Sequence, residues 1–233
     1  METILKTETD KLDNPTWYSL SETHEDFAVD CQDIKFYHPD YCPFGGFINS
    51  GEIETGIEKY ASLTNHFYVV GSKPTINDKV RLNDELVCNQ MVLDKRIDIE
   101  IKENIIELRT EGQKAELSAL VNLVQPGYFK EKTSDLGHYY GIYKDNKLVA
   151  VTGERMKMNG YTEVSAVVTH PEHTGKGYAK MLIAYSTGRI FNESKIPYLH
   201  VADTNTGAIK LYEKLGFYTR RKISFWKLIA NDN

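Results

Sequence analysis

The chain has 233 residues, of which 41% are hydrophobic and 26% are charged, as in an ordinary globular protein. This length accommodates one large domain or two small ones. A net charge of −5 without a basic block argues against nucleic acid as a partner, and no apolar run reaches the length of a membrane span. The residues before 14 lack the apolar core of a signal peptide. Cys31, Cys42 and Cys88 lack C-x-x-C spacing, so we expect reduced thiols and a cytoplasmic location.

The first half of the chain predicts a small α/β region without a catalytic motif. Residues 1–13 read as a disordered tail, and residues 14–100 as the N-terminal α/β region. Asn14-Pro15 predicts a helix start, because proline is favoured in the first helical turn. Prolines and glycines between residues 38 and 46 predict a loop. The other expected elements are a helix over 52–63 and strands over 67–70 and 86–93.

The second half, residues 101–233, predicts strands and helices in alternation after a charged boundary segment over 94–101. Apolar residues at helical spacing predict a helix over 114–124, which Pro126-Gly127 ends. Residues 144–146, K-D-N, are a typical hairpin turn. The expected strands are 105–109, 139–143, 147–154, 164–169, 198–201, 217–221 and 224–229, and the other expected helices are 177–194 and 206–215.

A glycine-rich turn follows the strand over 164–169 and opens the next helix. Residues 174–179 read T-G-K-G-Y-A. Gly175 and Gly177 let the backbone approach an anion without a Cβ clash, and N–H groups at a helix start attract negative charge. The turn therefore predicts a phosphate site. A P-loop NTPase does not fit, because Gly177 stands where that motif needs Ser or Thr after Gly-Lys.

A second motif follows the strand over 198–201. Asn205 precedes A-I-K-L-Y-E-K-L-G-F over residues 208–217. This pattern predicts a helix that carries Tyr212, with Asn205 near its start and Gly216 at its end.

The two motifs and the order of the elements resemble the GNAT superfamily of N-acetyltransferases, and more closely its FR47-like branch. The core of the resemblance covers residues 105–230, and it departs from the family pattern at Thr174, where Gln or Arg is usual. It implies a mixed α/β (α+β) GNAT fold, with a mostly antiparallel central sheet flanked by helices and a bulge that splays its fourth and fifth strands apart. Residues 14–100 would supply packing, a wall of the acceptor pocket, or a degenerate half-GNAT domain.

The resemblance implies acetyl-CoA as co-substrate and no metal. Backbone N–H groups of residues 175–180 would bind the pyrophosphate, and backbone groups of residues 167–169 would pair with the pantetheine amides like an added strand. Asn205 would bind the cofactor or order a water. The expected cofactor-binding residues are Val167, Val168, Thr169, Thr174, Gly175, Lys176, Gly177, Tyr178, Ala179, Lys180 and Asn205.

The resemblance also implies catalytic roles for Tyr212 and Glu163. Tyr212 would protonate, or hydrogen-bond to, the departing coenzyme A thiolate; the alternative is a tyrosine that packs in the core. Glu163 would take a proton from the substrate ammonium, with Glu154 as the competing base; an exposed carboxylate at a strand end is the alternative. His170 and His200 are interpreted as structural.

We therefore expect an acyl-CoA-dependent N-acetyltransferase, in which an amine attacks the thioester directly and a backbone N–H near Val168 stabilises the oxyanion. The acceptor would be a small-molecule or peptide amine, and the aromatic pairs at 128–129 and 139–140 would line its pocket or pack in the core. Two alternatives stay open: a related enzyme with another acyl donor or acceptor, such as the glycine acyltransferase-like relatives, and a coenzyme A-binding sensor or interaction module. A monomer and a homodimer both fit the sequence.

Overall fold

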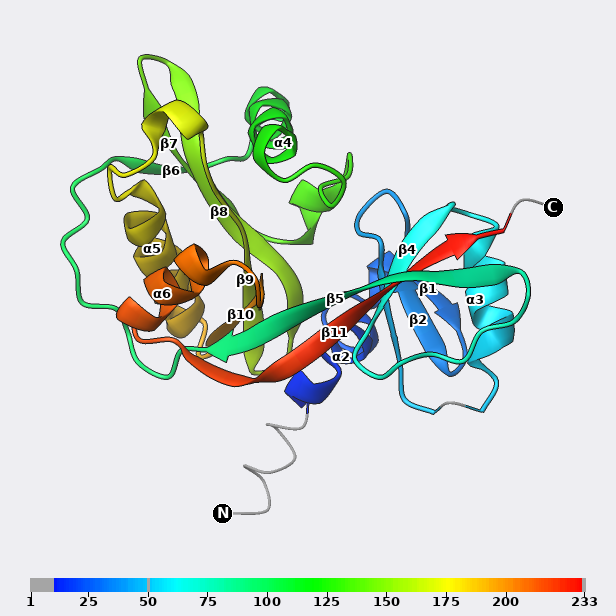
Figure 1. The fold of residues 1–233 in the computed structure, drawn as a ribbon. Helices are drawn as coiled ribbons and strands as arrows, with labels where there is room; N and C mark the ends of the chain where they lie inside the picture. Colours follow the sequence, from blue (N-terminus) through cyan, green and yellow to red (C-terminus); the bar gives the residue numbers. More distant parts are fainter. Residues whose placement is uncertain (1–10, 50, 232–233) are drawn as a thin grey trace.

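A computed structural model of the chain describes residues 11–49 and 51–231 (Figure 1). Within these residues the strands form one sheet of eleven, in the order β1-β2-β3-β4-β11-β5-β10-β9-β8-β7-β6. Neighbours pair antiparallel except β3 with β4 and β9 with β10. The strands are β1 (Ala28–Cys31), β2 (Ile34–Tyr37), β3 (Phe44–Phe47), β4 (His66–Val70), β5 (Val80–Val92), β6 (Ile105–Glu107), β7 (Tyr139–Lys144), β8 (Lys147–Met158), β9 (Tyr161–Thr169), β10 (Ile196–Ala202) and β11 (Tyr218–Ala230).

Helices cover both faces of the half of the sheet that ends in β6 (Figure 1). α5 and α6 pack on one face, where Ile183 and Tyr212 join Val164 of β9 in a buried cluster. α4 packs on the opposite face, where Leu117 contacts a cluster that includes Val168. No helix in the described ranges is long and apolar enough to cross a bilayer. The helices are α2 (Pro15–Ser21), α3 (Ile53–Ala61), α4 (Glu111–Val124), α5 (Tyr178–Asn192) and α6 (Thr206–Lys214), with 3₁₀ turns η1 (Lys11–Asp13), η2 (Glu25–Phe27), η3 (Thr133–Leu136) and η4 (Pro171–His173).

The sheet runs across the boundary predicted near residue 100. β5 belongs to the first half of the chain, yet it lies between β10 and β11, with Met91 opposite both Leu199 and Thr219. β11 in turn pairs with β4, where Trp226 is opposite Val69. The two halves of the chain therefore share one sheet, and each depends on strands of the other for its pairing.

The last strand corrects the prediction of two strands over 217–221 and 224–229. β11 is continuous from Tyr218 to Ala230. A register shift between Thr219 and Arg221 accommodates the irregular sequence, so the ladder with β5 continues past it.

The segment predicted as a loop over 38–46 ends in a strand. β3 pairs with both β2 and β4. Gly45 marks a close approach rather than a turn, because a Cβ there would lie 2.2 Å from the ring of Phe36. β1 and β2, which the sequence did not predict, have four residues each, too few for a clear alternation of polar and apolar residues.

The tail predicted over residues 1–13 is ordered at its end. Lys11–Asp13 forms η1, and Leu12 is buried. The carbonyl of Leu12 accepts a hydrogen bond from Gln90 Nε2 at 2.6 Å, and Asp13 pairs with Arg220 and Arg221. These contacts outweigh the polar composition of the segment. Residues 1–10 of the predicted tail lie outside the described residues.

The predicted splay of two strands is confirmed. β9 and β10 pair only from Ile196 opposite Tyr161 to Tyr198 opposite Glu163, and then diverge. The ladder between β8 and β9 shifts register next to Ala166, whose φ of 49° lies in the left-handed region. The bulge bends β9 away from β10, which opens a gap in the sheet.

Candidate active site

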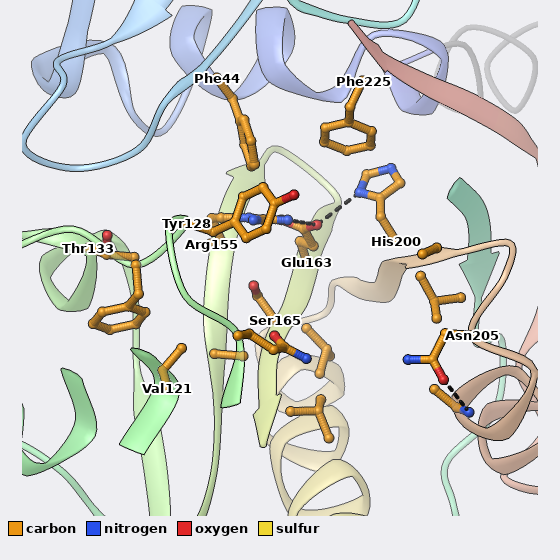
Figure 2. A pocket seen from close by; sticks show the side chains of 18 of the residues that line it. Phe44, Val121, Tyr128, Thr133, Arg155, Glu163, Ser165, His200, Asn205 and Phe225 are labelled. Carbon is orange, nitrogen blue, oxygen red and sulfur yellow. Dashed lines mark hydrogen bonds and ion pairs between the residues drawn. The ribbon is translucent and has the colours of Figure 1, made fainter. Parts of the chain in front are cut away.

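A cavity of about 320 Å³ lies where β9 and β10 diverge (Figure 2). Residues 164–167 of β9 and 200–202 of β10 line it, and α6 adds Tyr212. The first half of the chain contributes Phe44 and Leu86 to its wall. The cavity is therefore built from both halves of the sequence.

The glycine turn follows β9 and η4 and opens α5 at Tyr178. Gly175 and Gly177 have φ values of 76° and 78°, in the region that favours glycine, and a Cβ added at either would meet nothing within 4 Å. The first intrahelical bond runs from Met181 N to Gly177 O at 3.2 Å, so the N–H groups of residues 178–180 have no partner within the helix. The turn presents these donors and the positive end of the helix dipole, which fits a phosphate.

Some side chains around the turn are buried in the core, and others are exposed to solvent. Thr174 Oγ1 donates to the carbonyl of Pro171 at 3.2 Å, and the ring of Tyr178 is buried. Their backbone groups are therefore the parts suited to an anion. Lys176 and Lys180 are exposed and add positive charge at the same end of α5.

The backbone of β9 alternates between β8 and the gap. His170 N donates to Val149 O at 2.8 Å. Along an antiparallel ladder, residue pairs joined by hydrogen bonds alternate with pairs that are not. The N–H and C=O groups of Val168 therefore point toward β8, whereas those of Val167 and Thr169 point into the gap. The side chains of Val167 and Val168 belong to the clusters under α5 and α4. The side chain of Val168 therefore lies in the core, that of Val167 is partly buried, and we infer that the backbone of Val167 faces the gap.

Tyr212 and Asn205 both line the cavity. Burial raises the pKa of the Tyr212 hydroxyl to about 12, and within the described residues that hydroxyl makes no hydrogen bond. Its ring packs edge-on against Phe217 with centroids 5.8 Å apart. Asn205 Oδ1 accepts a hydrogen bond from Ala208 N at 3.1 Å, so Asn205 is the N-cap of α6 as well as a wall residue.

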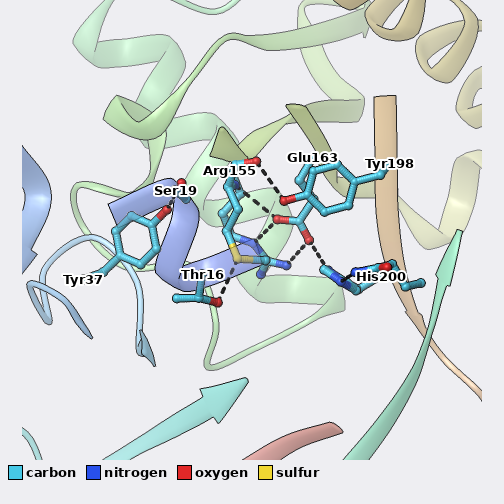
Figure 3. A network of polar contacts seen from close by, with 9 residues as sticks. Thr16, Ser19, Tyr37, Arg155, Glu163, Tyr198 and His200 are labelled. Carbon is cyan, nitrogen blue, oxygen red and sulfur yellow. Dashed lines mark hydrogen bonds and ion pairs between the residues drawn. The ribbon is translucent and has the colours of Figure 1, made fainter. Parts of the chain in front are cut away.

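Glu163 lies beside the cavity with every acceptor position occupied (Figure 3). Its Oε2 accepts from Arg155 Nε at 2.9 Å and Met156 N at 3.2 Å, and its Oε1 from Arg155 Nη2 at 2.7 Å and His200 Nδ1 at 2.8 Å. Burial raises the pKa of this carboxyl, but the charge and hydrogen bonds of Arg155, with His200, outweigh it and lower the pKa to about 2. A saturated carboxylate of low pKa is poorly suited to the general-base role predicted for Glu163. It is also no exposed strand-end residue, because its side chain is 1% exposed.

His200 is held between Glu163 and Gln90. Gln90 Oε1 accepts from Arg220 Nη1 at 3.0 Å, and Gln90 Nε2 donates to Leu12 O at 2.6 Å, which fixes the orientation of the amide. Gln90 Nε2 therefore also donates to His200 Nε2, at 3.2 Å, and His200 Nδ1 donates to Glu163. Both ring nitrogens of His200 are engaged, so the imidazole has no lone pair open to the cavity.

Glu154, the competing base, is not among the residues that line the cavity. Its Cα partner in the ladder is Val164, which packs under α5, so the carboxylate lies on that face of the sheet. Its Oε2 accepts from Lys157 Nζ at 2.7 Å and His138 N at 3.2 Å. Its side chain is buried, and it does not line the cavity.

Comparison with known proteins agrees with this geometry. Residues 104–217 match the model of the acetyltransferase (GNAT) family. This part of the chain is a GNAT domain. No curated protein matches the sequence.

Solved structures share the architecture over nearly the whole chain. A candidate GNAT-family acetyltransferase from Novosphingobium aromaticivorans is 28% identical, with 95% of this chain and 99% of that chain covered and a TM-score of 0.85. A GCN5-related N-acetyltransferase from Kribbella flavida is 14% identical, with 88% and 90% covered and a TM-score of 0.60. A tandem GNAT protein from the clavulanic acid biosynthesis pathway is 15% identical, with 86% and 79% covered and a TM-score of 0.55. The last two likenesses show the fold alone.

Three of the four predicted aromatic residues line the cavity: Tyr128, Phe129 and Tyr139. Tyr140 packs instead with Tyr178 beneath α5. No group of three or more His, Cys, Asp or Glu side chains in residues 11–49 and 51–231 is arranged to hold a metal ion.

Several wall residues of the cavity were not predicted from the sequence. Arg155 had one available signal, since a charged residue lies inside a strand that is otherwise buried. Ser165 gave none, because a serine in a strand is ordinary. Phe44 and Phe225 reach the cavity only through the pairing of β3, β4 and β11, which the sequence did not predict.

Proposed function

We propose that the protein is an acetyl-CoA-dependent N-acetyltransferase in which the acceptor amine attacks as the free base. The observation that carries this proposal is the gap between β9 and β10, where Val167 and Tyr212 line one cavity. β9 leads from this cavity to the turn at Gly175 and Gly177, so both ends of an extended cofactor have a suitable environment. The GNAT family of residues 104–217 supports the same reaction class.

The chain's own groups would divide the binding of acetyl-CoA between them. N–H groups at the start of α5 would bind the pyrophosphate, and the backbone of Thr169 and Val167 would pair with the pantetheine arm as an added strand. The bound molecule supplies the acetyl thioester. The N–H of Val167, rather than of its neighbour Val168, would donate to the thioester carbonyl, because the backbone of Val167 faces the gap.

Proton movement follows from the state of the polar side chains. Among the described residues that line the cavity, Glu163 is the one carboxylate, and neither it nor His200 has an open acceptor. The amine must therefore arrive unprotonated, and its extra proton leaves to water after the C–N bond forms. Ser165 Oγ lines the cavity without a hydrogen-bond partner in the described chain and can accept a hydrogen bond from the amine.

Tyr212 would assist the departure of the coenzyme A thiolate. As the C–S bond breaks, its hydroxyl would donate a hydrogen bond to the thiolate. With a pKa of about 12 for this phenol, against about 8.5 for a thiol, stabilisation of the thiolate by that hydrogen bond is favoured over full proton transfer. Solvent then completes the protonation.

The experiment that tests the proposal combines calorimetry with thiol release. Acetyl-CoA and coenzyme A should bind the wild-type chain, and a panel of amines should release free thiol. Succinyl-CoA and a medium-chain acyl-CoA measure the donor preference. Binding without thiol release from any amine would favour the sensor, and absence of binding would contradict the proposal.

A further inference from the structure

The part of the cavity beyond Ser165 has one open cationic edge. Arg155 uses Nε and Nη2 to hold Glu163. Its Nη1 has no hydrogen-bond partner within the described residues, and it is not among the buried unpartnered atoms, so solvent reaches it. The side chain of Arg155 is 15% exposed, and it lines the cavity. An incoming ligand therefore meets unused guanidinium donors at this point.

Among the described lining residues, no carboxylate has an oxygen free to pair with a cationic ligand. Glu163 is the one carboxylate among the described lining residues, and its two oxygens already accept four hydrogen bonds. The second ammonium group of a polyamine or aminoglycoside would therefore find no negatively charged oxygen free to accept its hydrogen bonds here. Its desolvation would be uncompensated.

The walls around Arg155 are aromatic (Figure 2). The guanidinium carbon lies 4.7 Å from the ring centroid of Phe44. Five further Phe and Tyr rings are among the described residues that line the cavity, from Tyr128, Phe129, Tyr139, Tyr212 and Phe225. Such walls favour an acceptor with an apolar or aromatic body.

The strand sets the length of the acceptor. Glu163 and Val167 are four residues apart on β9, at most about 13 Å along the strand because the bulge at Ala166 shortens it. Arg155 is held at the Glu163 end of this segment, and two residues of extended peptide span about 7 Å. Ser165 lies between the two ends, and its hydroxyl is open to the amine.

We propose that the acceptor is a primary amine of dipeptide size with an aromatic or apolar body, and that its carboxylate binds Arg155 Nη1. The proposal rests on the proposed function. A carboxylate matches guanidinium donors better than any neutral group, and a charge-assisted hydrogen bond is worth about ten-fold or more in affinity. Arg155 would act as a specificity residue, whereas Ser165 would orient the amine.

The test compares three acceptors with the wild-type enzyme: phenylalanyl-glycine, phenylalanyl-glycinamide and spermidine. We expect kcat/KM to be about ten-fold higher for the dipeptide than for its amide, and lowest for spermidine. Calorimetry with saturating coenzyme A gives a readout without turnover, in which N-acetyl-phenylalanyl-glycine should bind about ten-fold more tightly than its amide. Equal values for acid and amide, or a preference for spermidine, would overturn the inference.

A paired variant locates the discrimination. Arg155→Met combined with Glu163→Gln removes both charges, so no buried charge is left unpaired. In this variant the kcat/KM values of the acid and the amide should become equal. Discrimination that persists in the folded variant would overturn the role of Arg155, and if the variant does not fold, the wild-type comparison alone decides. Failure of the proposed function is distinct, because it would appear as no coenzyme A binding or as no thiol release with any amine.

Discussion

Replacement of Glu163 by Gln separates the structural role of this residue from the catalytic role predicted for it. The folded carboxyl has a pKa of about 2, against an ordinary value of 4.5. The pKa of the folded state is lower by about 2.5 pH units. At about 1.4 kcal/mol for each pH unit, this difference corresponds to about 3 kcal/mol of stability. Because the folded pKa is the lower one, this stability is present above pH 4.5 and is lost as the pH falls toward 2. The variant also leaves Arg155 without its partner, which agrees with a cost of about 3–5 kcal/mol for a broken buried pair.

The assay is denaturant unfolding at pH 7, with the pH profile of kcat for the folded variant. We expect a loss of about 3 kcal/mol, or a melting temperature lower by about 6–12 °C. Glu172→Gln is the control, because that side chain is 82% exposed and its replacement should cost less than about 0.5 kcal/mol. A variant as stable as the wild type would refute the stability argument. A rate that is lost at pH 7 and recovered at high pH would restore Glu163 as the base.

Three further predictions concern the cofactor, the thiolate and the buried histidine. Gly177→Glu should lower acetyl-CoA affinity at least ten-fold by charge repulsion, whereas Gly177→Ala, with the same backbone strain, should lower it less; equal calorimetric affinities would contradict the site. Tyr212→Phe should lower kcat about ten-fold or more while coenzyme A affinity and stability stay near wild type, and an unchanged kcat with rate-limiting chemistry would remove its role. Burial, with the charge of Lys157, lowers the pKa of His24 from 6.5 to about 4, so unfolding free energy should fall by about 3 kcal/mol as the pH drops from 6.5 toward 4. In His24→Gln this fall should disappear, and a persistent fall would assign it to other groups.

The sequence was most informative where one short segment has one structural consequence. The glycine turn and the helix with Tyr212 formed as predicted, because positive φ values and an N-cap are local requirements. The splay of β9 and β10 was also expected from the family resemblance.

Long-range pairing could not be predicted in the same way. Nothing in residues 80–92 indicates that this strand lies between β10 and β11, since the partners are more than a hundred residues away in sequence. The environment of Glu163 has the same origin. Its saturation depends on Arg155 in the next strand and on His200 in another, so the sequence alone could not separate a base from a buried ion pair.

The pH dependence of kcat/KM with two acceptors of different basicity tests the central claim most directly. The claim is that the amine must arrive unprotonated, because neither Glu163 nor His200, the carboxylate and imidazole of the described cavity lining, has an acceptor open to take its proton. Phenylalanyl-glycine has an α-amine with a pKa of about 8, and 2-phenylethylamine has an alkylamine close to lysine, with a pKa of about 10. We expect the rising limb of kcat/KM to move by about 2 pH units between these acceptors, because it follows the pKa of the free amine. A rising limb at the same pH for both would show that a group of the enzyme takes the proton, and it would contradict the account.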